Sequence, residues 1–219
     1  MFLEVDSIIF PDCCEVIQVA SQQFVYPIFK CGRSSLTWNM ESRGWTFVPE
    51  QDINKLVTPI KIFLRDPRDR FLSGVNTYMQ HLAREGNELD QHTVLYFVNR
   101  YLFLNRHYAP QFFWLLNLAR FARPDTLVTF SPMTGINQLT DANDHAGIAP
   151  LTDVLREKIN SFNWSKLELY LYLDQILIDH IDKTISIQDL IKHVQTNHSE
   201  LYKLVFQPTL NITNVLSKT

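Results

Sequence analysis

Two short segments of the sequence carry cations beside glycine and hydroxyl residues, a combination that suits anion binding. The first segment runs from Lys30 to Ser35 and has the sequence K-C-G-R-S-S. Its glycine allows close approach of the backbone, its lysine and arginine supply charge, and its serines supply hydroxyl donors. The segment lacks the G-x-x-x-x-G-K-[ST] pattern of Walker loops. Taken alone, so short a pattern also fits an ordinary turn between a strand and a helix.

The second segment follows a predicted strand and opens a predicted helix. Arg65 stands at the strand end, and Asp66 and Pro67 suit the N-cap and the first helical position. Ser73 lies two turns into this helix. One interpretation is a well-capped helix with solvated charges. The other is that Arg65 and Ser73 hold a phosphate, because the planar guanidinium donates in pairs to phosphate oxygens.

Together the two segments resemble the sulfotransferases that use 3′-phosphoadenosine 5′-phosphosulfate (PAPS). The first is similar to the family's P-K-x-G-[ST]-[ST] loop, with Phe29 in place of proline and the larger Arg33 in place of a small residue. Residues 65–73 match R-D-P-x-x-R-x-x-S at every fixed position. Residues 107–111 (H-Y-A-P-Q) resemble the H-W-x-P-Q element of membrane-anchored carbohydrate sulfotransferases, and residues 172–174 resemble their Y-x-x-D region more loosely.

The resemblance implies a donor and a set of roles. PAPS would be the co-substrate and adenosine 3′,5′-bisphosphate the product, with no metal required. Lys30 would stabilise charge on the bridging oxygen as the bisphosphate leaves, and Arg65 and Ser73 would bind the 3′-phosphate. The residues implied for the 5′-phosphosulfate are Lys30, Cys31, Gly32, Arg33, Ser34 and Ser35. The acceptor would be a hydroxyl group of a carbohydrate or a small alcohol.

The transfer also needs a base for the acceptor proton, and histidine suits this role near neutral pH. We predict His107, because it lies in the H-Y-A-P-Q element; the alternative is a structural His107 that packs against Trp114. His81, Glu41 and Glu50 are further candidates.

Composition limits the other classes of function. A net charge of −3 and a pI of about 6.1 argue against a general nucleic-acid binder. The three cysteines (Cys13, Cys14 and Cys31) form no C-x-x-C pair, and His180, His193 and His198 are not spaced as one metal site. No apolar run approaches the ~20 residues of a membrane span, and acids stand where a signal peptide has basic residues. We therefore predict a cytoplasmic protein, the alternative being a piece cut from a longer, anchored parent.

Hydrophobic patterns predict an α/β fold in which strands at 23–29, 58–64 and 126–130 alternate with helices. The expected helices begin near 34 and 67 and cover 91–104, 109–121, 151–159, 164–181 and 187–205. We predict one domain over 1–219, three layers (αβα) around a central parallel sheet, and a helical C-terminal part. The resemblance implies the P-loop NTPase-like sulfotransferase fold.

Two other functions remain compatible with the residues. A P-loop nucleotide kinase would have a similar fold, although Lys30 is misplaced for a Walker lysine. A nucleotide-binding protein without activity is the second alternative. The acceptor would contact the loops at 85–91 and 134–149, on position alone.

Overall fold

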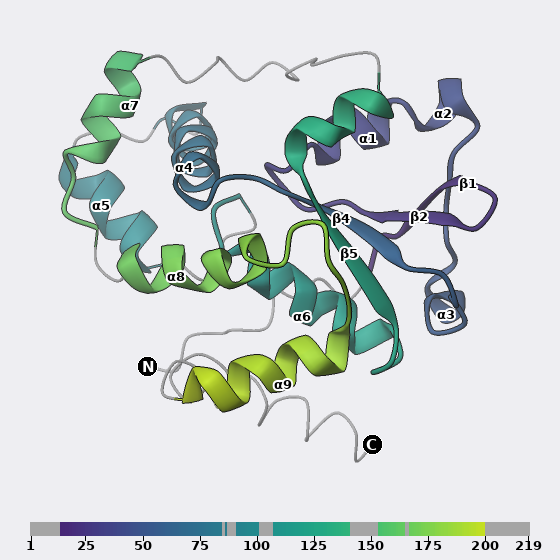
Figure 1. The fold of residues 1–219 in the computed structure, drawn as a ribbon. Coiled ribbons are helices and arrows are strands. Elements are labelled where there is room, and N and C mark those ends of the chain that lie inside the picture. Colours follow the sequence, from purple (N-terminus) through teal and green to yellow (C-terminus); the bar gives the residue numbers. More distant parts are fainter. Residues whose placement is uncertain are drawn as a thin grey trace, which may run out of the picture.

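The structure is a computed structural model that describes residues 14–84, 86, 91–100, 107–140, 153–164 and 167–199. Its strands are β1 (Ile17–Ala20), β2 (Gln23–Tyr26), β3 (Thr46–Phe47), β4 (Ile60–Leu64), β5 (Leu127–Pro132) and β6 (Thr184–Ser186). Its helices are α1 (Arg33–Trp38), α2 (Met40–Arg43), α3 (Glu50–Ile53), α4 (Pro67–Arg84), α5 (Gln91–Arg100), α6 (Gln111–Phe121), η2 (Met133–Gln138), α7 (Asp153–Asn160), α8 (Leu167–Ile178) and α9 (Ile187–Asn197). They surround one open sheet (Figure 1).

The sheet is mixed, with the strand order β3-β1-β2-β4-β5-β6. The pairs β2–β4 and β4–β5 are parallel, whereas β1, β3 and β6 are antiparallel to their neighbours. The predicted parallel sheet is therefore correct for its centre and wrong for its edges. One reason is the tight turn between β1 and β2, where Gln22 has a φ of 57°. A connection of two residues can join only antiparallel strands, because a parallel pair needs a long crossover.

The three predicted strands are confirmed as β2, β4 and β5. The sequence analysis missed β1, β3 and β6, which have only four, two and three residues. Segments as short as β3 and β6 carry too few alternating positions for a strand to be recognised by its pattern.

Side chains that alternate along the central strands enter two separate cores. Ile60, Ile62 and Leu64 of β4 pack in the core that also contains residues of α6, α8 and α9. Phe63, the residue between two of them, packs on the other face with Leu36 of α1 and Ile136 of η2. Helices therefore cover both faces of the sheet, as the predicted layering requires (Figure 1).

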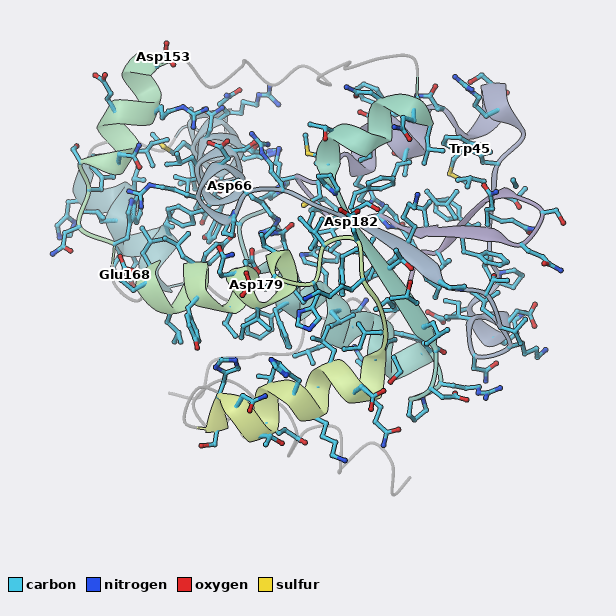
Figure 2. All side chains as sticks on the ribbon, viewed as in Figure 1. Trp45, Asp66, Asp153, Glu168, Asp179 and Asp182 are labelled. Carbon is cyan, nitrogen blue, oxygen red and sulfur yellow. The ribbon has the colours of Figure 1, made fainter. Side chains whose placement is uncertain are left out.

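A third core lies among helices beside the sheet. It joins α4, α5, α7 and the start of α8 through buried residues that include Phe71, Val94, Ile159 and Tyr170. The predicted N-cap of α4 is confirmed, because the Asp66 carboxylate accepts a hydrogen bond from the Asp69 N–H at 2.8 Å. Asp66 is labelled at this position in Figure 2.

Several expectations differ from the structure or fall outside the described residues. The single helix expected from residue 34 is divided at Asn39 into α1 and α2. Outside the described residues lie Cys13, most of the predicted acceptor loop at 85–91, residues 141–149 of the other, and the helix ends at 101–104 and 200–205. Where residues are described, no helix is both long and apolar enough to cross a membrane.

Candidate anion-binding site

The loop that follows β2 makes a strained turn around Lys30. Lys30 has a φ of 64° and Gly32 a φ of 83°, so both occupy the left-handed region. The Cys31 N–H donates to the Ile28 carbonyl at 3.1 Å, which closes the turn. A left-handed conformation costs a residue other than glycine roughly 1–2 kcal/mol. Such strain persists only where the surroundings impose it, and it is frequent at functional sites.

Gly32 fulfils a steric requirement that differs from the one predicted. A Cβ atom at this position would lie 2.0 Å from the Cδ1 atom of Ile136 in η2. The close approach that glycine permits is therefore to η2, the segment that follows β5, and the positive φ of Gly32 adds a second reason for glycine.

Two cationic side chains, those of Lys30 and Arg65, follow the ends of the parallel strands β2 and β4. The Lys30 ammonium and the Arg65 guanidinium are both half-buried. Burial, with the positive charges of Arg65 and Arg70, lowers the pKa of Lys30 from 10.5 to about 8, and burial also lowers the pKa of Arg65. Among the described residues, neither side chain has a hydrogen bond or an ion pair. The arrangement concentrates positive charge that an anion would stabilise.

Arg70, by contrast, is fully buried and belongs to the scaffold of the site. Its Nε donates to the Phe29 carbonyl at 3.1 Å, and its Nη1 donates to the Tyr170 hydroxyl at 2.8 Å and to the Ala109 carbonyl. The sequence analysis gave Arg70 no role, although it is the second arginine of R-D-P-x-x-R-x-x-S. That fixed position was the available signal.

Gln111 joins three parts of the chain through one buried amide. Its Oε1 accepts from the Cys31 Sγ at 3.0 Å and from the Arg65 N–H at 2.9 Å. Its Nε2 donates to the Arg65 carbonyl at 2.9 Å and to Asp174 Oδ2 at 3.0 Å. Two accepted and two donated bonds use the hydrogen-bonding capacity of the amide. The sequence analysis placed Gln111 in a motif but gave it no role.

Asp174 lies in the same network, on α8. Its Oδ1 accepts from the Phe112 N–H at 3.1 Å. Burial raises the pKa of this carboxyl to about 6, while the charge of Arg70 acts in the opposite direction. Gln111 and Asp174, which are far apart in the sequence, are thus brought together beneath the loop.

Other predicted loop residues lie in different environments. Arg33 forms an ion pair with Glu15 at 2.5 Å, and its guanidinium lies 4.6 Å from the centre of the Phe29 ring. Its charge is therefore balanced, unlike that of Lys30. Ser34 is exposed on α1, and Ser35 beside it is half-buried. Ser73 is half-buried on α4, three residues after Arg70.

The predicted bases divide into two groups. The His107 ring is half-buried and lies edge-on to Phe29, with 5.7 Å between ring centres, and 5.3 Å from the His81 ring. Trp114 stacks on Phe29 at 5.1 Å, so Phe29 is in ring contact with both His107 and Trp114. This places His107 and His81 beside the loop.

The two carboxylates have other surroundings. Glu41 is exposed on α2, and Glu50 on α3 accepts a hydrogen bond from the Cys14 N–H at 2.8 Å. The contact of Glu50 is thus with a residue before β1 and not with the loop after β2.

Histidines also gather on α9 and at the end of α8. The ring centres of His180 and His193 are 5.5 Å apart, and those of His193 and His198 are 5.7 Å apart. In the part of the chain that is described, no group of three or more His, Cys, Asp or Glu residues is arranged to hold a metal ion.

Comparison of the chain with protein-family models, with curated proteins and with solved structures finds no match.

Proposed function

We propose that the chain is a sulfotransferase with a P-loop NTPase-like fold that transfers the sulfuryl group of PAPS to a hydroxyl of a carbohydrate or small alcohol. The observation that carries the proposal is the pair of cations, Lys30 and Arg65, at the ends of adjacent parallel strands. Ligands of open α/β sheets bind beyond these ends. A nucleoside with two phosphate groups would give Lys30 and Arg65 one phosphate each, which a nucleotide with a single phosphate would not.

In the proposed reaction the chain binds PAPS between the loop and the start of α4. Arg65 and Ser73 bind the 3′-phosphate, and the backbone and serine hydroxyls of residues 31–35 bind the 5′-phosphosulfate. The acceptor oxygen attacks sulfur in line, and the bond from sulfur to the bridging oxygen breaks. Lys30 stabilises the charge that develops on that oxygen, an effect that is strong in a partly buried site. His107, with His81 beside it, accepts the acceptor proton.

A binding titration tests the donor assignment. We expect adenosine 3′,5′-bisphosphate to bind at least about tenfold more tightly than 5′-AMP or ATP, because a hydrogen-bonded charge contributes ~1.5–3 kcal/mol. The variant Arg65→Ala should remove this advantage and leave the affinity for 5′-AMP unchanged. Isothermal titration calorimetry measures both.

The matched control is Arg68→Ala. Arg68 is exposed and donates to Asn160 Oδ1 at 3.1 Å, so its loss should leave all three affinities unchanged. Equal affinities of the wild-type chain for the bisphosphate and 5′-AMP would contradict the proposed function. Tight binding of PAPS without turnover on a panel of hydroxyl acceptors would instead favour a nucleotide-binding protein.

A further inference from the structure

The strained residue Lys30 lies between two residues that are fixed by buried side chains. On one side, the Phe29 carbonyl accepts from Arg70 Nε at 3.1 Å. On the other, the Cys31 Sγ donates to Gln111 Oε1 at 3.0 Å. Arg70 and Gln111 both have an exposed fraction of 0%. Both hydrogen bonds are therefore made by side chains that are themselves shielded from solvent.

Both side chains are themselves held in place. Arg70 Nη1 is bound to Tyr170 and Ala109, and the Gln111 amide is bound to Arg65 and Asp174. A side chain fixed by several partners transmits its position to the backbone that it contacts. Because a left-handed residue other than glycine needs such surroundings, these contacts explain why Lys30 keeps its conformation.

We propose that Arg70 and Gln111 form a clamp that holds Lys30 in its left-handed conformation and sets the position of its ammonium relative to Arg65. Both are positioning residues, and their role in binding rests on the proposed function. Gln111 binds the loop through Cys31 and the end of β4 through both backbone groups of Arg65. One amide thus fixes the spacing between the two proposed phosphate subsites.

Cys31 offers the mildest way to open the clamp. Cys31→Ala removes the contact between the loop and Gln111 but leaves the bonds from Gln111 to Arg65. Cys31→Ser keeps a donor at this position. Cys14→Ala is the matched control, because Cys14 is also a buried cysteine, and it lies before β1, outside the loop that carries Lys30.

Two half-ligands separate the subsites. The ratio of the affinities for adenosine 3′,5′-bisphosphate and 3′-AMP measures what the loop contributes through the 5′-phosphate. We expect Cys31→Ala to lower this ratio about fivefold, the loss of one hydrogen bond, with the affinity for 3′-AMP unchanged. Cys31→Ser and Cys14→Ala should keep the wild-type ratio. A purely structural role of Cys31 would weaken both ligands equally.

Gln111→Met, which has a similar shape but no amide, should weaken 3′-AMP as well, because Gln111 also holds the backbone of Arg65. If that variant does not fold, the Cys31 pair decides the question. A folded Cys31→Ala chain that keeps the wild-type ratio overturns the clamp and leaves the proposed function standing. A wild-type chain that binds the bisphosphate no more tightly than 3′-AMP and 5′-AMP overturns the proposed function, and the clamp's role in binding with it.

Discussion

Lys30 combines two unfavourable features in one residue, a left-handed backbone and a partly buried charge near two guanidinium groups. Both features destabilise the free protein, the second only when the Lys30 ammonium is protonated. An anionic ligand would offset the second feature, because an opposite charge nearby favours the protonated ammonium. The affinity of the proposed site should therefore depend on pH in a range where lysine is ordinarily insensitive.

The pH dependence of binding tests this. The pKa of Lys30 is lowered to about 8 in the free chain, and a bound bisphosphate would raise it. Binding above pH 8 then requires uptake of a proton, so the affinity should fall by up to about tenfold per pH unit. Calorimetric titration of adenosine 3′,5′-bisphosphate between pH 7 and pH 10 measures this slope.

Lys30→Arg is the control for that titration, because arginine stays protonated over the whole range. Its affinity should be nearly independent of pH above 8. Parallel slopes for the wild type and Lys30→Arg would show that another group titrates.

Among the secondary-structure elements, α4 packs very closely against residues 107–108, the segment that precedes α6. A Cβ atom on Gly74 would lie 2.3 Å from the His107 carbonyl oxygen and 2.7 Å from the Tyr108 Cβ. Glycine in the middle of a helix ordinarily costs ~0.5–1 kcal/mol relative to alanine. Here it permits the contact between α4 and the segment that carries His107.

Gly74→Ala should therefore destabilise the protein, although alanine is the better helix former. We expect the free energy of unfolding to fall by about 1–3 kcal/mol, the usual cost of overpacking. Urea denaturation measures the change. Gly44→Ala measures the other cost of replacing a glycine by itself: a Cβ atom there would meet nothing within 4 Å, so only the φ of 65° opposes alanine, at roughly 1–2 kcal/mol. A Gly74→Ala chain as stable as the wild type would show that the segment can move away.

The helices and strands also show which parts of the structure can be predicted from the sequence. β2, β4 and β5 could be recognised because long apolar runs end at Lys30, at the Asp66 cap and before η2. The roles of Arg70 and Gln111 could not, because their partners are backbone groups and side chains distant in sequence. Arg33 matched the expected loop position, but its pairing with Glu15 depends on the placement of β1, a strand that the sequence analysis missed.

At the scale of the whole molecule, Asp174 joins elements that are far apart in the sequence. It binds the start of α6 through Phe112 and the end of β4 through Gln111, and it lies near the buried charge of Arg70. Leaving a buried donor without its acceptor costs about 1–3 kcal/mol.

Asp174→Asn should accordingly lower the free energy of unfolding by about 1–3 kcal/mol at pH 7. An amide can accept one of the two hydrogen bonds but must direct an N–H towards the other donor. Thermal or urea denaturation measures the loss. An unchanged stability would contradict the assignment of Asp174 as the buried acceptor for both Phe112 and Gln111.

The same variant has a predictable pH dependence. Because burial raises the pKa of Asp174 to about 6 in the folded chain, the folded state binds more protons than the unfolded state between about pH 4 and pH 6. The stability that Asp174 contributes is thus greatest below pH 4 and decreases as pH rises through 6. The difference in stability between the wild type and Asp174→Asn should be smaller at pH 7 than at pH 4.

The mixed sheet contains both local and distant strand pairs, and we expect the local pair to form first during folding. β1 and β2 are joined by a short turn, so they pair locally. Lys61 of β4, in contrast, pairs with Val25 of β2 and Thr129 of β5, which are both distant from it in the sequence. Contacts between distant residues form slowly, because loop closure costs entropy before they stabilise anything. Gln111 needs β4, the loop after β2 and α8 all in place before its four bonds exist. The clamp should therefore be among the last parts to form during folding, so that its assembly reports completion of the native state.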